Sequence, residues 1–346
     1  MACAYCYYLG KITGDGAANP RMSGPIADET VRQILSAHAG GRAVIAFQGG
    51  EPTLAGLPFY NRIMHSICRH RPAHTAVQLT FQTSGFGVTR DFARFFYEHQ
   101  CLVGLSLDGP RRFHDAFRVR GNGQGTYDVA TGAARLLTQH RVDFNVLCTV
   151  NEVNAAHGRE VYRCLRDDVG ARFLQFIPVV GAARGSVAAA AFGAFLCEVF
   201  DEWRATDIGR VFVQNVESAL AAMVGAPPLV CTHAPTCGVE VVVEQDGSVY
   251  ACDHAVDAEH KLGNVMDQEL SQLIASPFQR AFGNAKSRLP ADCLTCRYLS
   301  ACHGGCPLHR DVTGKSALCD GYRTFYRYAE PLLASLAAQL ARTPSP

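Results

Sequence analysis

Eight of the fifteen cysteines lie between positions 231 and 319, and this concentration constrains the fold more than any other feature. In chain order they are Cys231, Cys237, Cys252, Cys293, Cys296, Cys302, Cys306 and Cys319. The segments between them are short and rich in Gly, His and Pro, which is typical of loops. A chain that gathers thiols in this way builds either a metal centre or a set of disulfides.

The remaining composition favours the metal centre. The chain has 346 residues, 48% of them hydrophobic, which suffices for one large domain and a smaller one. A net charge of +1 argues against a nucleic-acid or membrane-surface partner, and no apolar stretch is long enough to span a bilayer. The first six residues lack the pattern of a secretory signal. We therefore expect a cytoplasmic protein, whose thiols stay reduced and serve metal or redox chemistry.

Short apolar segments alternate with helical patterns through the first half of the chain. Such alternation predicts βαβ units and a parallel sheet. Polar and glycine-rich motifs follow the predicted strands, at the position where barrel enzymes build their active sites. Five strands rather than eight predict a partial or truncated barrel of the TIM type. The predicted strands are 43–47, 77–81, 102–105, 144–150 and 173–177.

Helix signals lie between and after these strands. Asp28 is a candidate cap for the first helix, and Thr89 for the helix 90–99. Further helices are predicted at 126–139, 159–166, 186–205, 211–223, 268–275 and 322–340. Gly225 to Pro228 is the expected domain boundary, and the turn Gln245 to Gly247 predicts a hairpin between 239–244 and 248–251.

Glu51 follows the first predicted strand, in the segment Gln48-Gly49-Gly50-Glu51-Pro52-Thr53. The two glycines let a ligand approach the backbone closely, and the Glu51 carboxylate is available to a cation. An ordinary strand-to-helix turn is the alternative explanation of this segment.

The cysteine spacing favours iron–sulfur clusters over zinc. A four-cysteine zinc site usually pairs two separated Cys-x2-Cys knuckles, but this region has only one, at Cys293 and Cys296. The looser spacing suits a cuboidal cluster, and eight thiolates would fill two of them. Zinc remains an alternative on spacing alone. The five cysteines elsewhere beyond the N-terminus are expected to be buried structural thiols, namely Cys68, Cys101, Cys148, Cys164 and Cys197.

Several of these motifs together resemble the radical S-adenosylmethionine (SAM) enzymes. Cys3-Ala4-Tyr5-Cys6-Tyr7-Tyr8 resembles the end of their Cys-x3-Cys-x2-Cys motif, and Gly49 to Pro52 resembles the segment that contacts the SAM amine. The C-terminal cysteines resemble the SPASM extension. Within this superfamily, Phe47–Gly56, Gly104–Pro110, Leu174–Ile177 and Cys252-Asp253 are most similar to anaerobic sulfatase-maturating enzymes. The resemblance covers nearly the whole chain.

This resemblance implies an α/β fold, with a partial (β/α)6 TIM-like barrel in 1–225. It further implies a SPASM domain with two auxiliary clusters in 226–330, and a C-terminal helix and tail in 331–346. The implied reaction oxidises a Cys or Ser side chain, in a Cys/Ser-x-Pro-x-Arg segment of a sulfatase polypeptide, to formylglycine. The implied cofactors are SAM, one SAM-binding [4Fe-4S] cluster and the two auxiliary [4Fe-4S] clusters. The implied electron donor is a flavodoxin or a ferredoxin.

The resemblance also assigns roles to individual residues. Cys3 and Cys6 would hold the SAM cluster, while Asp253, beside a cluster ligand, would be the general base, its pKa raised in a dry pocket. Arg118 suits the SAM carboxylate because its guanidinium binds carboxylates bidentately. The full set implied to line the SAM site is Tyr5, Gly50, Ser106, Arg118 and Val180. One auxiliary cluster would use Cys231, Cys237, Cys252 and Cys306, and the other Cys293, Cys296, Cys302 and Cys319.

The N-terminus departs from the family pattern. The first cysteine of the triplet would stand two residues before Met1, and the strand that precedes the motif in the family is also absent. We therefore expect the chain to be truncated, with an internal Met taken as its start, so that it cleaves SAM poorly and exposes an edge of its sheet. A stop codon upstream of any Cys codon would exclude this explanation.

Two other functions remain open from the sequence. One is a SPASM enzyme that forms thioether or carbon–carbon crosslinks in peptides. The other is a non-catalytic protein that binds clusters or zinc.

Overall fold

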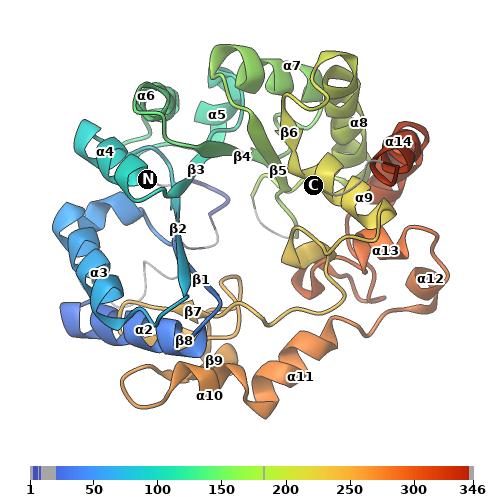
Figure 1. The fold of residues 1–346 in the computed structure, drawn as a ribbon. Coiled ribbons are helices and arrows are strands. Elements are labelled where there is room, and N and C mark those ends of the chain that lie inside the picture. Colours follow the sequence, from blue (N-terminus) through green and yellow to red (C-terminus); the bar gives the residue numbers. More distant parts are fainter. Residues whose placement is uncertain (1–2, 7, 9–20, 182–183, 343–346) are drawn as a thin grey trace.

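A six-stranded parallel sheet forms the larger part of the computed structural model, which describes residues 3–6, 8, 21–181 and 184–342. The strands follow one another in chain order across the sheet. In Figure 1 they form an open arc with the helices on its outside, as expected for a partial barrel. The strands are β1 Arg42–Phe47, β2 Ala76–Thr83, β3 Leu102–Ser106, β4 Phe144–Val150, β5 Phe173–Pro178 and β6 Phe212–Val213.

The five predicted strands are confirmed, and the structure adds the two-residue strand β6. Phe212 and Val213 pair with Phe173 and Leu174 of β5. We predicted a helix over 211–223, but α9 begins only at Gln214. Strand β1 lies at the opposite edge of the sheet, where Val44 is 53% exposed.

The helices of the barrel are α2 Gly24–Ala37, α3 Leu57–His70, α4 Arg90–Glu98, α5 Arg111–Phe117, α6 Tyr127–Gln139, α7 Gly158–Arg163, α8 Ala189–Thr206 and α9 Gln214–Met223. The Thr89 cap is confirmed, because its Oγ1 accepts a hydrogen bond from the Phe92 amide at 3.3 Å. The Asp28 cap is wrong. Helix α2 starts four residues earlier, after Ser23, and the Asp28 carboxylate pairs instead with Arg62 at 2.8 Å.

The C-terminal part consists of short elements joined by loops. The predicted hairpin is confirmed: β7 Val242–Val243 pairs with β8 Ser248–Tyr250, and β9 Lys261–Asn264 completes an antiparallel sheet. The helices of this part are α10 Leu270–Ile274, α11 Pro277–Ala285, α12 Ala291–Leu294, α13 Leu299–Cys302 and α14 Cys319–Leu340.

Contacts at both edges of the open sheet hold this C-terminal part across the barrel. On the β1 side, the buried Gln33 of α2 donates to the Val265 carbonyl at 2.7 Å and accepts from the Leu270 amide at 2.5 Å. On the β6 side, α14 crosses α8 so closely that a Cβ on Gly321 would lie 2.2 Å from the Ala189 carbonyl oxygen. Figure 1 shows the segment from β7 to α13 running between these two anchors.

Two apolar clusters stabilise the barrel, one along the β1–β3 half of its sheet arc and one along the β4–β6 half. The first includes Tyr60, Phe81 and Phe96, between β1–β3 and helices α2–α4. The second includes Phe176 and Phe195 and extends to Phe325 of α14, so the last helix is part of the barrel core. No helix in the described part of the chain is both long and apolar enough to cross a membrane.

Candidate active site and metal centres

The Cys3–Cys6 segment lies at the carboxyl ends of the strands. The Ala4 amide donates to the Phe117 carbonyl at 3.1 Å, and the Tyr5 and Phe117 ring centroids are 5.6 Å apart. Cys3 is buried and Cys6 is half-buried. Burial raises the pKa of the Cys3 thiol, while the nearby Arg118 guanidinium lowers it. A thiol that needs a cation to ionise is suited to bind a metal that supplies positive charge.

Asp108 organises the polar groups beneath this loop. Its carboxylate pairs with Arg118 Nε at 2.8 Å, and the two side chains are 0% and 8% exposed. It also accepts hydrogen bonds from the Thr149 amide at 2.8 Å and from the Tyr5 hydroxyl. Tyr5 and Arg118, two residues implied to bind SAM, are therefore joined through one buried carboxylate that our sequence reasoning gave no role.

The Arg118 guanidinium already has partners in this structure. Besides Asp108, it donates through Nη2 to Thr149 Oγ1 at 3.0 Å. Although burial opposes the charged form, Asp108 holds the pKa of Arg118 well above its usual range. Arg118 is thus a fixed, fully charged group beside the Cys3 loop, and Nη1 is the part of its fork that has no hydrogen-bond partner among the described residues.

Gly50, Ser106 and Val180 follow or end three different strands of the sheet. A Cβ on Gly50 would meet no heavy atom within 4 Å, so the space beside its backbone is open. Ser106 ends β3, where its Oγ accepts from Gln82 Nε2 at 3.1 Å. Val180 follows β5 and packs partly against the core. Together with Tyr5 and Arg118 they lie at the carboxyl ends of the strands.

The Glu51 carboxylate, which the sequence suggested as available to a cation, already accepts several hydrogen bonds from described residues. It caps the turn Pro52–Ala55 and accepts from Thr53 Oγ1 at 2.9 Å, from Thr83 Oγ1 at 2.7 Å and from the Ser84 amide at 3.0 Å. The Ser84 hydroxyl also contacts it. These donors fix the carboxylate in place next to Gly50.

Asp253 lies between Cys252 and the end of β1. Its Oδ1 accepts from Cys252 Sγ at 3.4 Å, and its Oδ2 accepts from Gln48 Nε2 at 3.2 Å. The side chain is 29% exposed, so the dry pocket that we expected around it is not formed by the described residues. Gln48 is an additional candidate, because it connects the barrel to the C-terminal part at this carboxylate.

The eight C-terminal cysteines form two separate groups of four. The inner quartet comprises Cys231, Cys237, Cys252 and Cys306. After burial, which is the larger cause, the Cys306 thiol raises the pKa of each of the other three, and that of Cys252 reaches about 12. Cys306 is therefore close enough to Cys231, Cys237 and Cys252 to act on them electrostatically, although at least 54 residues separate it from them in the sequence.

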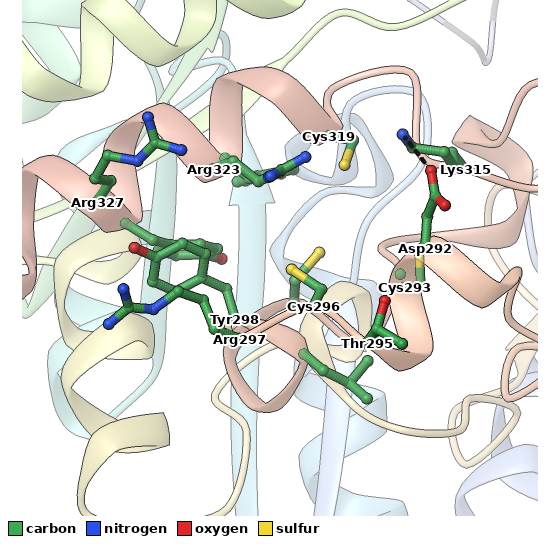
Figure 2. A pocket seen from close by; sticks show the side chains of 15 residues that line it. Asp292, Cys293, Thr295, Cys296, Arg297, Tyr298, Lys315, Cys319, Arg323 and Arg327 are labelled. Atoms are coloured by element: carbon green, nitrogen blue, oxygen red, sulfur yellow. Dashed lines mark hydrogen bonds and ion pairs between the residues drawn. The ribbon is translucent and has the colours of Figure 1, made fainter.

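The outer quartet comprises Cys293, Cys296, Cys302 and Cys319, which all line one cavity of about 440 Å³. Figure 2 shows the Cys296 and Cys319 side chains directed toward this common space, with Lys315 and Arg323 beside it. Burial, with smaller contributions from Cys319 and Cys293, raises the pKa of Cys302 to about 11. Helix α14 contributes Cys319 at its first residue, so the cavity is fixed to the barrel core.

The geometry argues against a mononuclear zinc site. In the described residues, no three His, Cys, Asp or Glu side chains come close enough together to bind one ion. A tetrahedral zinc ion with bonds of about 2.3 Å would require sulfurs about 3.8 Å apart. A cuboidal cluster places its thiolates at the corners of a larger body, which fits the outer cavity.

Three of the five other cysteines are buried as we expected: Cys101, Cys148 and Cys164. Cys197 is half-buried. The prediction is wrong for Cys68, which is exposed because it lies on the solvent side of α3.

Comparisons with known families and structures agree with this arrangement. Residues 1–165 match the Radical SAM superfamily, and residues 235–297 match the SPASM iron–sulfur cluster-binding domain. The chain is thus a radical SAM enzyme, an oxidoreductase, with a C-terminal SPASM domain. Its cofactors are SAM and [4Fe-4S] clusters.

Individual relatives define the family further. The chain is 37% identical to a serine-type anaerobic sulfatase-maturating enzyme of Klebsiella aerogenes, over 97% of this chain and 83% of the relative. It is 32% identical to a cysteine-type enzyme of Clostridium perfringens, over 97% and 95%. The solved structure of native anSMEcpe with bound AdoMet superposes with a TM-score of 0.90 at 30% identity, covering 97% of this chain and 95% of that one. The chain belongs to the anaerobic sulfatase-maturating enzymes.

Proposed function

We propose that this chain oxidises a Cys or Ser side chain of a sulfatase polypeptide, within a Cys/Ser-x-Pro-x-Arg segment, to formylglycine. The observation that carries this proposal is Asp253, which lies next to the inner quartet and is held by Gln48 at the end of β1. Relatives of both substrate types support it. Crosslinking of peptides or a non-catalytic role is not favoured, because the similarity to sulfatase-maturating enzymes extends over nearly the whole chain.

In this proposal the cofactor ligands are the cysteines named above. Cys3 and Cys6 hold the SAM cluster, and the inner and outer quartets each hold one auxiliary cluster. Tyr5, Gly50, Ser106, Arg118 and Val180 line the SAM site. When bound, SAM and its cluster supply a carbon radical that removes one hydrogen atom from the substrate Cβ.

The protein residues supply orientation and proton transfer. Asp108 fixes Arg118 and Tyr5, and so fixes the loop that carries Cys3 and Cys6. Gln48 orients the Asp253 carboxylate, which takes the proton from the substrate hydroxyl or thiol. Loss of one hydrogen atom, one proton and one electron converts the CH2–OH of serine to an aldehyde. For cysteine the same losses give a thioaldehyde, which water hydrolyses to the aldehyde with release of hydrogen sulfide.

The auxiliary clusters that the two quartets would hold would accept the electron left on the substrate. The proposed base lies beside one of these quartets, because Cys252 is the direct neighbour of Asp253 and donates to its Oδ1 at 3.4 Å. A flavodoxin or ferredoxin is the proposed donor of the electron that SAM cleavage requires, and the cytoplasm is the proposed location. We further propose that the SAM barrel occupies 1–225, the SPASM domain 226–330 and the final helix and tail 331–346.

Mass spectrometry tests the proposed reaction. The protein is produced with an N-terminal extension that places a Cys two residues before Met1, reconstituted, and incubated without oxygen with SAM, a reductant and a peptide that carries either Ser or Cys in the recognition segment. We expect the Ser peptide to lose two hydrogen atoms, or the Cys peptide to gain the aldehyde, together with 5′-deoxyadenosine. The matched control is Asp253→Asn, which should release 5′-deoxyadenosine without forming the aldehyde. A crosslinked peptide with no aldehyde would contradict the proposal.

A further inference from the structure

Lys286 is a fully buried lysine next to the inner quartet. It directly follows α11 and is 0% exposed. Its ammonium donates a hydrogen bond to the carbonyl of Cys231. Within the described part of the chain no carboxylate pairs with it. The groups that act electrostatically on it are the sulfurs of Cys231, Cys237 and Cys306 and the Arg310 guanidinium.

A buried ammonium with only one neutral acceptor is costly. Transfer of such a charge out of water costs several kcal/mol unless an anion lies nearby. Among these groups, the only ones that can become anions are three of the four thiols of the inner quartet, once they are ionised. Ligation of the quartet, which keeps its thiolates ionised, would provide the missing negative charge.

The two neighbouring basic groups, Arg310 and His233, differ from Lys286 in their partners or in their charge. Arg310 donates to the carbonyls of Lys286 at 2.7 Å, Arg288 at 3.0 Å and Gly304 at 3.2 Å, so its guanidinium is engaged in holding the backbone. His233 is buried and stays neutral, because burial first and the Lys286 charge second lower its pKa to about 4. Lys286 is thus a buried positive group beside three of the four sulfurs of the inner quartet, whereas Arg310 acts on Cys237 among them.

Among the described residues, the outer quartet has no equivalent buried and unpaired cation beside it. Lys315, beside Cys319, is paired with Asp292 at 3.3 Å, and its side chain is 28% exposed. Arg323 is exposed at the edge of the cavity. Solvent and a carboxylate screen these charges, whereas the Lys286 charge acts through a low-dielectric interior.

From this geometry we propose that Lys286 raises the reduction potential of the cluster held by the inner quartet, so that this cluster accepts the electron that leaves the substrate. A cluster gains one negative charge when it is reduced, and a buried cation beside it stabilises that form more than the oxidised one. Lys286 is a positioning and tuning residue rather than a catalytic one. The inference rests on the proposed assignment of the inner quartet to one cluster.

An EPR-monitored redox titration of the reconstituted full chain tests this role. Lys286→Gln removes the charge but keeps a donor for the Cys231 carbonyl, and Lys286→Arg keeps the charge. We expect Lys286→Gln to lower the reduced-to-oxidised ratio of one auxiliary cluster at least tenfold at a fixed potential, which is about 59 mV for a one-electron couple. Lys286→Arg should stay close to the wild type. Lys261→Gln, an exposed lysine of β9, is the matched control and should change nothing.

A midpoint unchanged in Lys286→Gln, or shifted equally in Lys286→Arg, would overturn the proposal. Loss of iron from Lys286→Gln alone would overturn it too, since the charge would then be needed to bind the cluster rather than to set its reduction potential. Loss of iron from both variants would also overturn it, because the side chain would then be required for packing around the quartet, whatever its charge. The cluster assignment is checked separately: Cys306→Ala should remove one auxiliary signal and its iron. If Cys306→Ala keeps full iron and sulfide, the assignment fails, whatever the result with Lys286.

Discussion

Removal of the Asp108 carboxylate should destabilise the protein strongly, because it leaves a buried guanidinium without its anion. Asp108→Asn keeps the size of the side chain and one acceptor for the Thr149 amide, which lies 2.8 Å from Oδ1. It replaces Oδ2, which pairs with Arg118 Nε at 2.8 Å and accepts from Tyr5, by an NH2 group that repels the guanidinium and cannot accept from the Tyr5 hydroxyl. Asp108 is 0% and Arg118 8% exposed, so water does not compensate for this loss.

The magnitude follows from the burial of this pair. Breaking a buried ion pair by removing one partner costs about 3–5 kcal/mol. Because both side chains are nearly inaccessible, we expect the upper part of that range in the free energy of unfolding. The assay is urea unfolding of the cluster-free protein, followed by circular dichroism. Cluster loading does not enter this measurement.

A double-mutant cycle supplies the control. Arg118→Met removes the cation instead of the anion, and the double variant removes both. The double variant should be more stable than Asp108→Asn alone, because no unpaired charge remains buried. If Asp108→Asn unfolds within about 0.5 kcal/mol of the wild type, which is typical of a surface substitution, the reasoning about this cluster is refuted.

Three further perturbations test other parts of the structure. Burial lowers the pKa of His114 to about 4, so this histidine stabilises the fold fully above its unfolded pKa of about 6.5, and the stability is lost as pH falls toward 4. Urea unfolding at pH 7 and 4.5 should therefore show a smaller loss for His114→Gln than for the wild type, and equal losses would refute this. Gln48→Ala should lower kcat about tenfold with KM unchanged, since it loses the 3.2 Å contact that orients Asp253, and a change in KM alone would argue against orientation. Gly321→Ala should destabilise the chain by about 1–3 kcal/mol because its Cβ would lie 2.2 Å from a carbonyl oxygen, whereas Gly132→Ala, with 3.9 Å of clearance on α6, should be neutral or stabilising in the same unfolding assay.

Local sequence patterns predicted correctly those elements that form mainly through interactions between residues close in the chain. The five longer strands and the hairpin around Asp246-Gly247 follow from apolar periodicity and turn chemistry. Strand β6 was missed because its two residues become a strand only by pairing with β5. Asp28 was a plausible cap, but Ser23 and Pro25 compete for the same helix start, and Arg62 gives Asp28 another partner.

The parts of the site that depend on tertiary contacts could not be predicted from the sequence. Motifs indicated the cysteines and the residues after the strands. However, the Asp108–Arg118 pair joins the ends of β3 and α5, and Tyr5 reaches it from the N-terminal loop. Likewise, nothing in the sequence around Lys286 indicates that it is fully buried, because its environment is formed by cysteines from 231 to 306. The exposure of Cys68 is decided by which face of α3 meets the sheet.

The most direct test of the central claim is the content of iron, acid-labile sulfide and zinc in protein purified and reconstituted without oxygen. The claim predicts iron and sulfide in equal amounts, with Cys302→Ala losing the iron and sulfide of one auxiliary cluster and Cys101→Ala, a buried thiol outside both quartets, losing none. Stoichiometric zinc without sulfide would contradict it.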